Sequence, residues 1–79
     1  MPTIIFQNGF RIMIYPNDHP PPHVHAFKSG QSVINLGDDR TKPFVRENRG
    51  MSVRDERLAL KLVAENREIL WEKWSEMYG

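Results

Sequence analysis

The residues best suited to chemistry are gathered in one short stretch, because all three histidines of the chain lie within seven positions. His23 and His25 are two residues apart, and side chains two apart on a β-strand point to the same side. Two neighbouring imidazoles could share a metal ion or a phosphate, or act together as a general acid and base. Asp18 could orient one ring through its carboxylate. The candidate catalytic residues are therefore His23, His25, Asp18 and His19.

His19 is the least natural member of this set. The triple proline Pro20–Pro22 separates it from His23, and proline rings favour an extended backbone. A polyproline II path rises about 3.1 Å per residue, so the four steps between these two histidines span roughly 12 Å. Convergence of all three rings would require a sharp bend, such as a cis proline.

Three interpretations of this segment stay open. In the structural one, rigid prolines bridge two parts of a sheet and the histidines hydrogen-bond the backbone at its edge. In the second, the histidines contact phosphate or RNA together with nearby arginines. The third is a metal site, but H-x-H alone is a weak signal, and no cysteine or reliably placed carboxylate completes four ligands. We therefore expect no metal and no cofactor. The serines occupy no G-x-S-x-G elbow, so a serine hydrolase is poorly supported.

Positive charge is concentrated in the middle of the chain. Residues 40–61 carry seven basic and three acidic side chains, a net charge of +4, whereas residues 1–39 sum to −1 and residues 62–79 to −2. Only the middle segment could attract a polyanion such as RNA. The alternative is a solvated face, since few aromatic residues for base stacking accompany it. The candidate nucleic-acid-binding residues are Arg46, Arg49, Arg54, Arg57 and Lys61.

Length and composition predict a single domain, residues 1–79. The 79 residues are 39% hydrophobic and 27% charged, which is typical of a globular protein. The chain has no cysteine, which excludes disulfides, zinc–thiolate centres and thiol nucleophiles. It has no P-loop, no dinucleotide-binding glycine motif and no apolar run long enough for a membrane span or secretory leader. With the start Met1-Pro2-Thr3, these features predict a cytoplasmic protein without a membrane partner.

Residues 1–49 are expected to form a β-rich half. Short β-branched or alternating runs predict strands at residues 3–6, 10–15, 23–27 and 31–36. Asn8-Gly9 is a hairpin turn signal, Ser29-Gly30 is a second turn, and Pro16 should end the second strand. Residues 43–45 could be a short edge strand or a loop.

Residues 50–79 are expected to form a helical half. Ser52 is a suitable N-cap, and Asp55 completes the S-x-x-[DE] pattern of a capping box. An apolar arc and a polar arc follow at about 100° per residue, which predicts an amphipathic helix packed on a sheet. Asn66 falls within the apolar arc, so we favour a break or bend there over a continuous helix. The apolar arc comprises Leu58, Ala59, Leu62, Val63, Ile69, Leu70 and Met77.

These elements define an α+β fold, with a small antiparallel sheet of three to five strands packed on a long or bent C-terminal helix. A second set of apolar side chains projects from the flank of that helix, namely Leu60, Trp71, Trp74 and Tyr78. Because Trp and Tyr are enriched at interface centres, this flank is the candidate partner-binding surface, for another protein or for a second copy of the chain. The alternative is that the sheet curls around the last helical turns and covers them.

Two motifs resemble a known bacterial family. Pro21-Pro22-His23-Val24-His25-Ala26 and the tail Ala64-Glu65-Asn66-Arg67-Glu68-Ile69-Leu70 with Trp74 are similar to the domain of unknown function 4160 family. The likeness covers nearly the whole chain, and the two motifs are specific in combination. Asn48-Arg49-Gly50-Met51-Ser52 is also similar to the helix entry of one subgroup, with Met51 where phenylalanine is usual. Members are commonly encoded beside a second small protein, in pairs similar to toxin–antitoxin modules. The resemblance implies a toxin that a small cognate protein neutralises, but it supplies no catalytic residues.

The leading hypothesis is therefore a toxin that acts on RNA or on a translation component through His23, His25 and the basic segment. One neutral and one protonated imidazole could cleave a phosphodiester without a metal, as a ribonuclease does, and binding alone would also inhibit. The alternative is a non-enzymatic interaction module, antitoxin-like or regulatory, that works through the aromatic helix flank. A metal-dependent enzyme is the third hypothesis.

Overall fold

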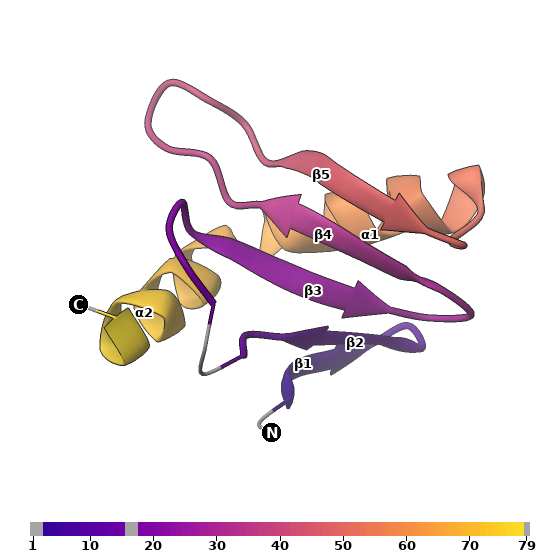
Figure 1. Cartoon of the computed structure of the whole chain (residues 1–79), viewed down its shortest axis with the longest axis horizontal. Helices are drawn as coiled ribbons and strands as arrows, with labels where there is room; N and C mark the ends of the chain where they lie inside the picture. The colour runs from indigo at the N-terminus through magenta and orange to yellow at the C-terminus, as the bar shows by residue number, and fades with distance from the viewer. Residues whose placement is uncertain (1–2, 16–17, 79) are drawn as a thin grey trace.

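Five antiparallel strands form one meandering sheet that is packed on two C-terminal helices. The computed structural model describes residues 3–15 and 18–78, so the expected start at Met1-Pro2 and the strand end at Pro16 lie outside it. The strands lie side by side in chain order, as Figure 1 shows. They are β1 (Thr3–Gln7), β2 (Phe10–Met13), β3 (His23–Phe27), β4 (Gln31–Asn35) and β5 (Phe44–Arg49). The helices are α1 (Val53–Glu65) and α2 (Arg67–Tyr78), and neither is long and apolar enough to cross a membrane.

The first hairpin turn follows from its two residues. Asn8 and Gly9 have φ of 53° and 81°, and a two-residue turn with both φ values positive matches the twist of the flanking strands. β3 lies in the centre of the sheet, where His25 is opposite Met13 of β2 and Val33 of β4. The segment that could be strand or loop forms the start of β5, which pairs with β4.

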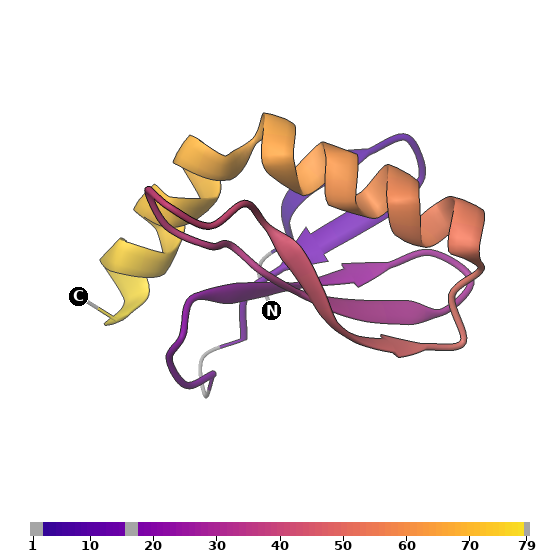
Figure 2. The same ribbon diagram turned by 90° about the horizontal axis from the view of Figure 1, so that it is seen from above.

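The hydrophobic core lies between α1 and one face of the sheet. Alternate residues of β3, Val24 and Ala26, are fully buried on this face, whereas His23 and His25 alternate with them. Figure 2 shows α1 lying across the sheet and α2 bending away past its end. The core comprises Phe10, Ile12, Ile14, Val24, Ala26, Ile34, Leu36, Met51, Ala59, Leu62, Val63, Leu70 and Trp74.

The helical half begins and bends where its sequence predicts. The Ser52 hydroxyl accepts a hydrogen bond from the Asp55 backbone N–H, which satisfies one of the unpaired donors at the start of α1. Asn66 ends α1, and both its backbone N–H and its side-chain amide donate to the Leu62 carbonyl. The favoured break at Asn66 is therefore confirmed, and the amide that interrupts the apolar arc is part of the joint.

This bend also changes which helical side chains are buried. Leu58, Ile69 and Met77 were expected on the apolar arc but are 42%, 48% and 37% exposed. Ile69 and Met77 belong to α2, which takes a different direction from α1 after Asn66, so one helical wheel does not describe both helices. Leu58 belongs to α1 and lies at the margin of its narrow buried face. Trp74, which was expected on the flank, is buried in the core instead.

Candidate functional site

The rings of His23 and His25 meet the carboxylate of Asp18 at the end of the sheet that α2 passes. Asp18 Oδ1 lies 3.4 Å from His23 Nε2 and 3.1 Å from His25 Nε2, and the ring centroids are 5.3 Å apart. Their side chains are only 11%, 5% and 12% exposed, in the order Asp18, His23, His25. We call this group the Asp–His cluster. The two rings are neighbours, as the strand spacing predicts, and Asp18 lies beside them.

The other ring nitrogen of each histidine is also engaged. His23 Nδ1 lies 2.9 Å from the Pro21 carbonyl oxygen and 3.3 Å from Arg46 Nη2. His25 Nδ1 lies 3.3 Å from Gln31 Nε2. Each ring is therefore oriented from behind, so that its Nε2 faces the carboxylate.

The C-terminal turn of α2 holds the loop that carries Asp18. The Tyr78 hydroxyl donates to the Tyr15 carbonyl and accepts a hydrogen bond of 3.0 Å from the Asp18 backbone N–H. The Tyr15 N–H in turn donates to Asp18 Oδ2 at 3.0 Å. The position of the carboxylate thus depends on a residue that is sixty positions away in the chain.

Aromatic rings line the cluster on two sides. The Tyr15 ring contacts His25 edge-on with centroids 4.4 Å apart, and Trp74 lies 5.3 Å from His23. Trp74 also packs on Tyr78 at 4.4 Å. These rings reduce the access of water, which strengthens the electrostatic interactions within the cluster.

Burial and hydrogen bonding oppose each other at the carboxylate. Burial opposes ionisation of Asp18, but the Tyr15 N–H and the two histidine rings outweigh it, so the pKa of Asp18 lies below the usual aspartate value. Burial lowers the pKa of His25, and the neighbouring carboxylate only partly offsets this. A lowered pKa favours the neutral form of the His25 ring, in which one ring nitrogen donates a hydrogen bond and the other accepts one.

His19 does not join the cluster. His19 is exposed, and among the described residues it is not part of the group of ligand atoms that lie close together. The Pro20–Pro21 peptide bond is cis, but His19 still lies apart from the other two histidines. Of the four candidate catalytic residues, the structure brings together Asp18, His23 and His25.

The candidate nucleic-acid residues are divided among several places. Arg46 lies next to the cluster, where its Nε donates to Asn35 Oδ1 at 2.8 Å. Arg49 forms an ion pair with Glu47 on the same strand. Arg54 is exposed on the first turn of α1. The basic segment is thus not one continuous face.

A groove with four cationic side chains lies between the loop before β5 and the helices. Lys42 lies in the loop, Arg57 and Lys61 belong to α1, and Arg67 begins α2. The apolar residues that line it are Pro43, Leu60 and Ala64, and its volume is about 590 Å³. The lining residues of this groove include no carboxylate within the described part of the chain. We call it the basic groove.

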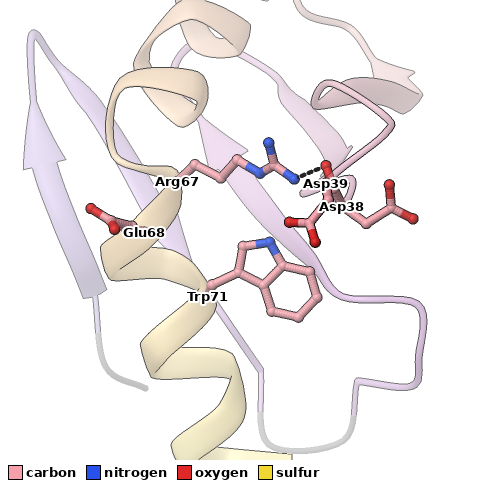
Figure 3. Close-up of a pocket in the computed structure, with 5 residues that line it drawn as sticks. All are labelled: Asp38, Asp39, Arg67, Glu68 and Trp71. Carbon is pink, nitrogen blue, oxygen red and sulfur yellow. Dashed lines mark hydrogen bonds between the residues drawn. The ribbon is translucent and has the colours of Figure 1, made fainter.

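A second pocket adjoins the basic groove at Arg67. It is lined by Asp38, Asp39, Arg67, Glu68 and Trp71 and has a volume of about 510 Å³. Figure 3 shows the Arg67 guanidinium reaching from α2 to the loop, where it donates to the Asp38 carbonyl oxygen. Arg67 therefore forms part of both hollows and ties the loop to the helical joint.

The partner-binding candidates differ in exposure. Leu60 and Trp71 are half-buried and line the basic groove and the adjoining pocket respectively. Tyr78 is half-buried against the cluster, and Trp74 is in the core. The alternative to an aromatic interface was that the protein's own fold covers the last helical turns. Trp74 is covered in this way, and Tyr78 is partly covered.

Several residues of both sites were not identified from sequence. Tyr15, which follows β2, and Gln31, which begins β4, support the cluster, but neither residue type carries a distinctive signal in the sequence. Lys42 in the loop before β5 and Arg67 at the start of α2 complete the basic groove, whose other two cationic residues lie on α1. A sequence signal for Arg67 existed, because it lies in the tail motif Asn66-Arg67-Glu68.

The fold and the cluster define a small α+β domain with a mostly buried Asp–His cluster at one end of an antiparallel sheet. The chain matches the family described as "Domain of unknown function (DUF4160)" over residues 9–75, and it belongs to that family. No curated protein and no solved structure matches the chain.

Proposed function

We propose that this protein is the cytoplasmic toxin component of a bacterial toxin–antitoxin-like module and that it acts by binding RNA or an RNA-containing translation component. The observation that carries the proposal is the basic groove. Four cations from three separate elements face one hollow there, among lining residues that carry no carboxylate. The implied neutralising partner is a small cognate protein.

Charge placed in this way suits a phosphate backbone. Lysine and arginine on opposite walls can contact successive phosphates, and release of condensed counterions then contributes to affinity. The apolar residues between them, Pro43, Leu60 and Ala64, offer a surface for ribose and base. Trp71 lies in the adjoining pocket beyond Arg67 and offers an aromatic platform for base stacking.

RNA binding is tested by fluorescence anisotropy of a labelled single-stranded RNA of mixed sequence, measured over a series of salt concentrations. We expect Arg57→Gln with Lys61→Gln to weaken binding and to reduce the slope of log K against log salt by about 1.4, since each phosphate contact contributes about 0.7. The matched control is Arg54→Gln with Lys73→Gln, which removes the same charge outside the groove. Equal losses in both double variants, or no binding by the wild-type chain at physiological salt, contradict the proposal.

Toxicity is tested separately by controlled expression in a bacterial host, with and without the adjacent gene product. We expect growth and protein synthesis to stop, and co-expression of the partner to restore both. The groove double variant should relieve the arrest at equal protein abundance. Growth arrest that persists with this variant would show that toxicity does not depend on RNA binding in the groove.

A second candidate function is a non-enzymatic interaction module, and one observation favours it. Ile69 and Met77 of α2 are apolar and exposed, so both side chains are available for contact with a partner. Capture of the cognate partner by the wild-type chain, but not by an Ile69→Lys variant with unchanged circular dichroism, supports this function. Trp71→Ala is the second variant, and unchanged capture by both contradicts it.

A further inference from the structure

We infer that Asp18, His23 and His25 form a binding site for one divalent first-row transition-metal ion of the Zn²⁺ type. Each residue offers one ligand atom, and these three atoms all lie within 4.8 Å of one another. This inference stands on the cluster alone and does not depend on RNA binding in the basic groove.

The spacing of the ligand atoms fits such an ion. Zinc lies about 2.1 Å from histidine nitrogen or carboxylate oxygen, so adjacent ligands around it are about 3.0–3.4 Å apart. Asp18 Oδ1 is 3.4 Å from His23 Nε2 and 3.1 Å from His25 Nε2. The two histidine nitrogens lie within 4.8 Å of each other, so the rings must rotate toward one another for both nitrogens to reach coordination distance.

The hydrogen bonds of His23 direct a lone pair toward the carboxylate. The Pro21 carbonyl oxygen can only accept, so the 2.9 Å contact places the proton of the neutral ring on Nδ1. Arg46 Nη2, which is also a donor, is farther from the same nitrogen at 3.3 Å. Nε2 of the neutral ring then carries a lone pair that faces the Asp18 oxygen, and a bound cation removes that repulsion. A histidine oriented by a backbone carbonyl is the usual arrangement of a metal ligand.

His25 and Asp18 have matching supports. Gln31 lies 3.3 Å behind His25 Nδ1, and rotation of its amide presents either a donor or an acceptor to the ring. With the amide oxygen toward Nδ1–H, the Nε2 atom is free to coordinate. The Tyr15 N–H engages Asp18 Oδ2, which leaves Oδ1 for the ion.

The donor set selects the class of ion. Two imidazoles and one carboxylate suit Zn²⁺, Fe²⁺, Co²⁺ or Ni²⁺, whereas Mg²⁺ and Ca²⁺ prefer sites made of oxygen alone. Three protein ligands leave at least one coordination position for water or a substrate oxygen. No metal was expected from the sequence, because no carboxylate could be placed reliably beside the histidines. The structure supplies one in Asp18, through a loop that Tyr78 holds in place.

The test is isothermal titration of the full chain with Zn²⁺, after treatment with a chelator and its removal, together with the visible absorption spectrum on adding Co²⁺. We expect one ion per chain, a cobalt spectrum typical of low coordination number, and little heat with Mg²⁺. Asp18→Asn and His25→Gln should each weaken Zn²⁺ binding by more than the roughly 10–100-fold that attends loss of an outer-shell partner.

Two variants make this test specific. His19→Gln removes the one histidine that lies outside the cluster and should bind Zn²⁺ as the wild type does. Gln31→Leu should weaken binding less than a ligand variant, since it removes only the support behind His25. Circular dichroism in the presence of chelator verifies that each variant is folded. Absence of a stoichiometric site in the wild-type chain, or equal loss in His19→Gln, overturns the inference, and the cluster is then a hydrogen-bonded histidine–aspartate group.

Discussion

The Asp–His cluster and the basic groove show two different ways of preparing a site. The cluster is mostly buried, and aromatic rings and hydrogen bonds from Tyr15 after β2, from Gln31 of β4 and from α2 fix its three side chains. The groove is open, and its two lysines and two arginines project from a loop and from two helices. A preorganised site selects a ligand by geometry, whereas an open charged one selects by charge and adapts to shape. The cluster is therefore suited to a small ion and the groove to an extended polyanion.

The largest expected effect tests how far the cluster depends on the core. Trp74→Ala removes the buried ring through which α2 packs on the cluster. We expect a loss of about 3–5 kcal/mol in the free energy of unfolding. Trp71→Ala, on the groove side, should lose no more than about 2 kcal/mol because its ring is partly exposed. Urea denaturation measures both. Equal losses of unfolding free energy in the two variants would contradict the idea that the core supports the cluster more than it supports the groove.

The next effect concerns the loop that borders the groove. Gly37 has φ +73°, and a Cβ atom there would lie 2.1 Å from the Thr41 carbonyl oxygen. Gly50 has a similar φ of +79° but open space around it. We expect Gly50→Ala to cost about 1–2 kcal/mol in unfolding free energy, which is the conformational penalty alone, and Gly37→Ala to cost clearly more. The same denaturation experiment compares them, and a smaller loss at Gly37 would contradict the tight loop seen here.

The joint between the helices connects the two sites and should give a smaller effect. Asn66→Ala removes the side-chain amide that donates to the Leu62 carbonyl at 2.9 Å. We expect a loss of about 0.5–1.5 kcal/mol, with faster amide hydrogen exchange in α2. Glu65→Ala, its exposed neighbour, is the control. Unchanged exchange in α2 would show that the joint does not govern the wall of the cluster.

The smallest effect is a titration in the groove-side loop. The backbone N–H groups of Arg40 and Thr41 donate to the Asp38 carboxylate, which lowers the pKa of Asp38 below the usual aspartate value. Such a group stabilises the fold above its unfolded pKa, and this stabilisation is lost as pH falls through its folded pKa. Carboxyl-carbon NMR in the folded and the urea-unfolded chain measures the two values. A folded pKa equal to or above the unfolded one would contradict the loop geometry.

Local patterns predicted most of the fold because local physics produces it. The turn at Asn8-Gly9, the strand 23–27 and the cap at Ser52 each depend on residues within a few positions. The neighbouring rings of His23 and His25 follow from strand periodicity in the same way. The extension of β5 to Arg49 was not predicted, since its charged sequence lacks a strand pattern and its pairing partner, β4, is separated from it by residues 36–43.

Long-range placements could not be predicted from the sequence alone. The burial of Trp74 depends on the direction that α2 takes after Asn66. The periodicity of apolar residues along one helix does not predict that direction. The closeness of Asp18 to the histidines depends on the loop path and on Tyr78. The basic groove combines Lys42 with Arg57 and Arg67, three residues that share no local pattern.

The hydrogen bonds from Tyr78 to the loop at Tyr15 and Asp18 have a kinetic consequence. Every strand pairs with its neighbour in sequence, so the sheet can assemble from short loops at low entropic cost, whereas this contact closes a loop of sixty residues. We expect the meander to form first and α2 to dock last. A brief detachment of α2 would then open the Asp–His cluster while the sheet stayed paired, giving an ion or a substrate a route in and out without global unfolding.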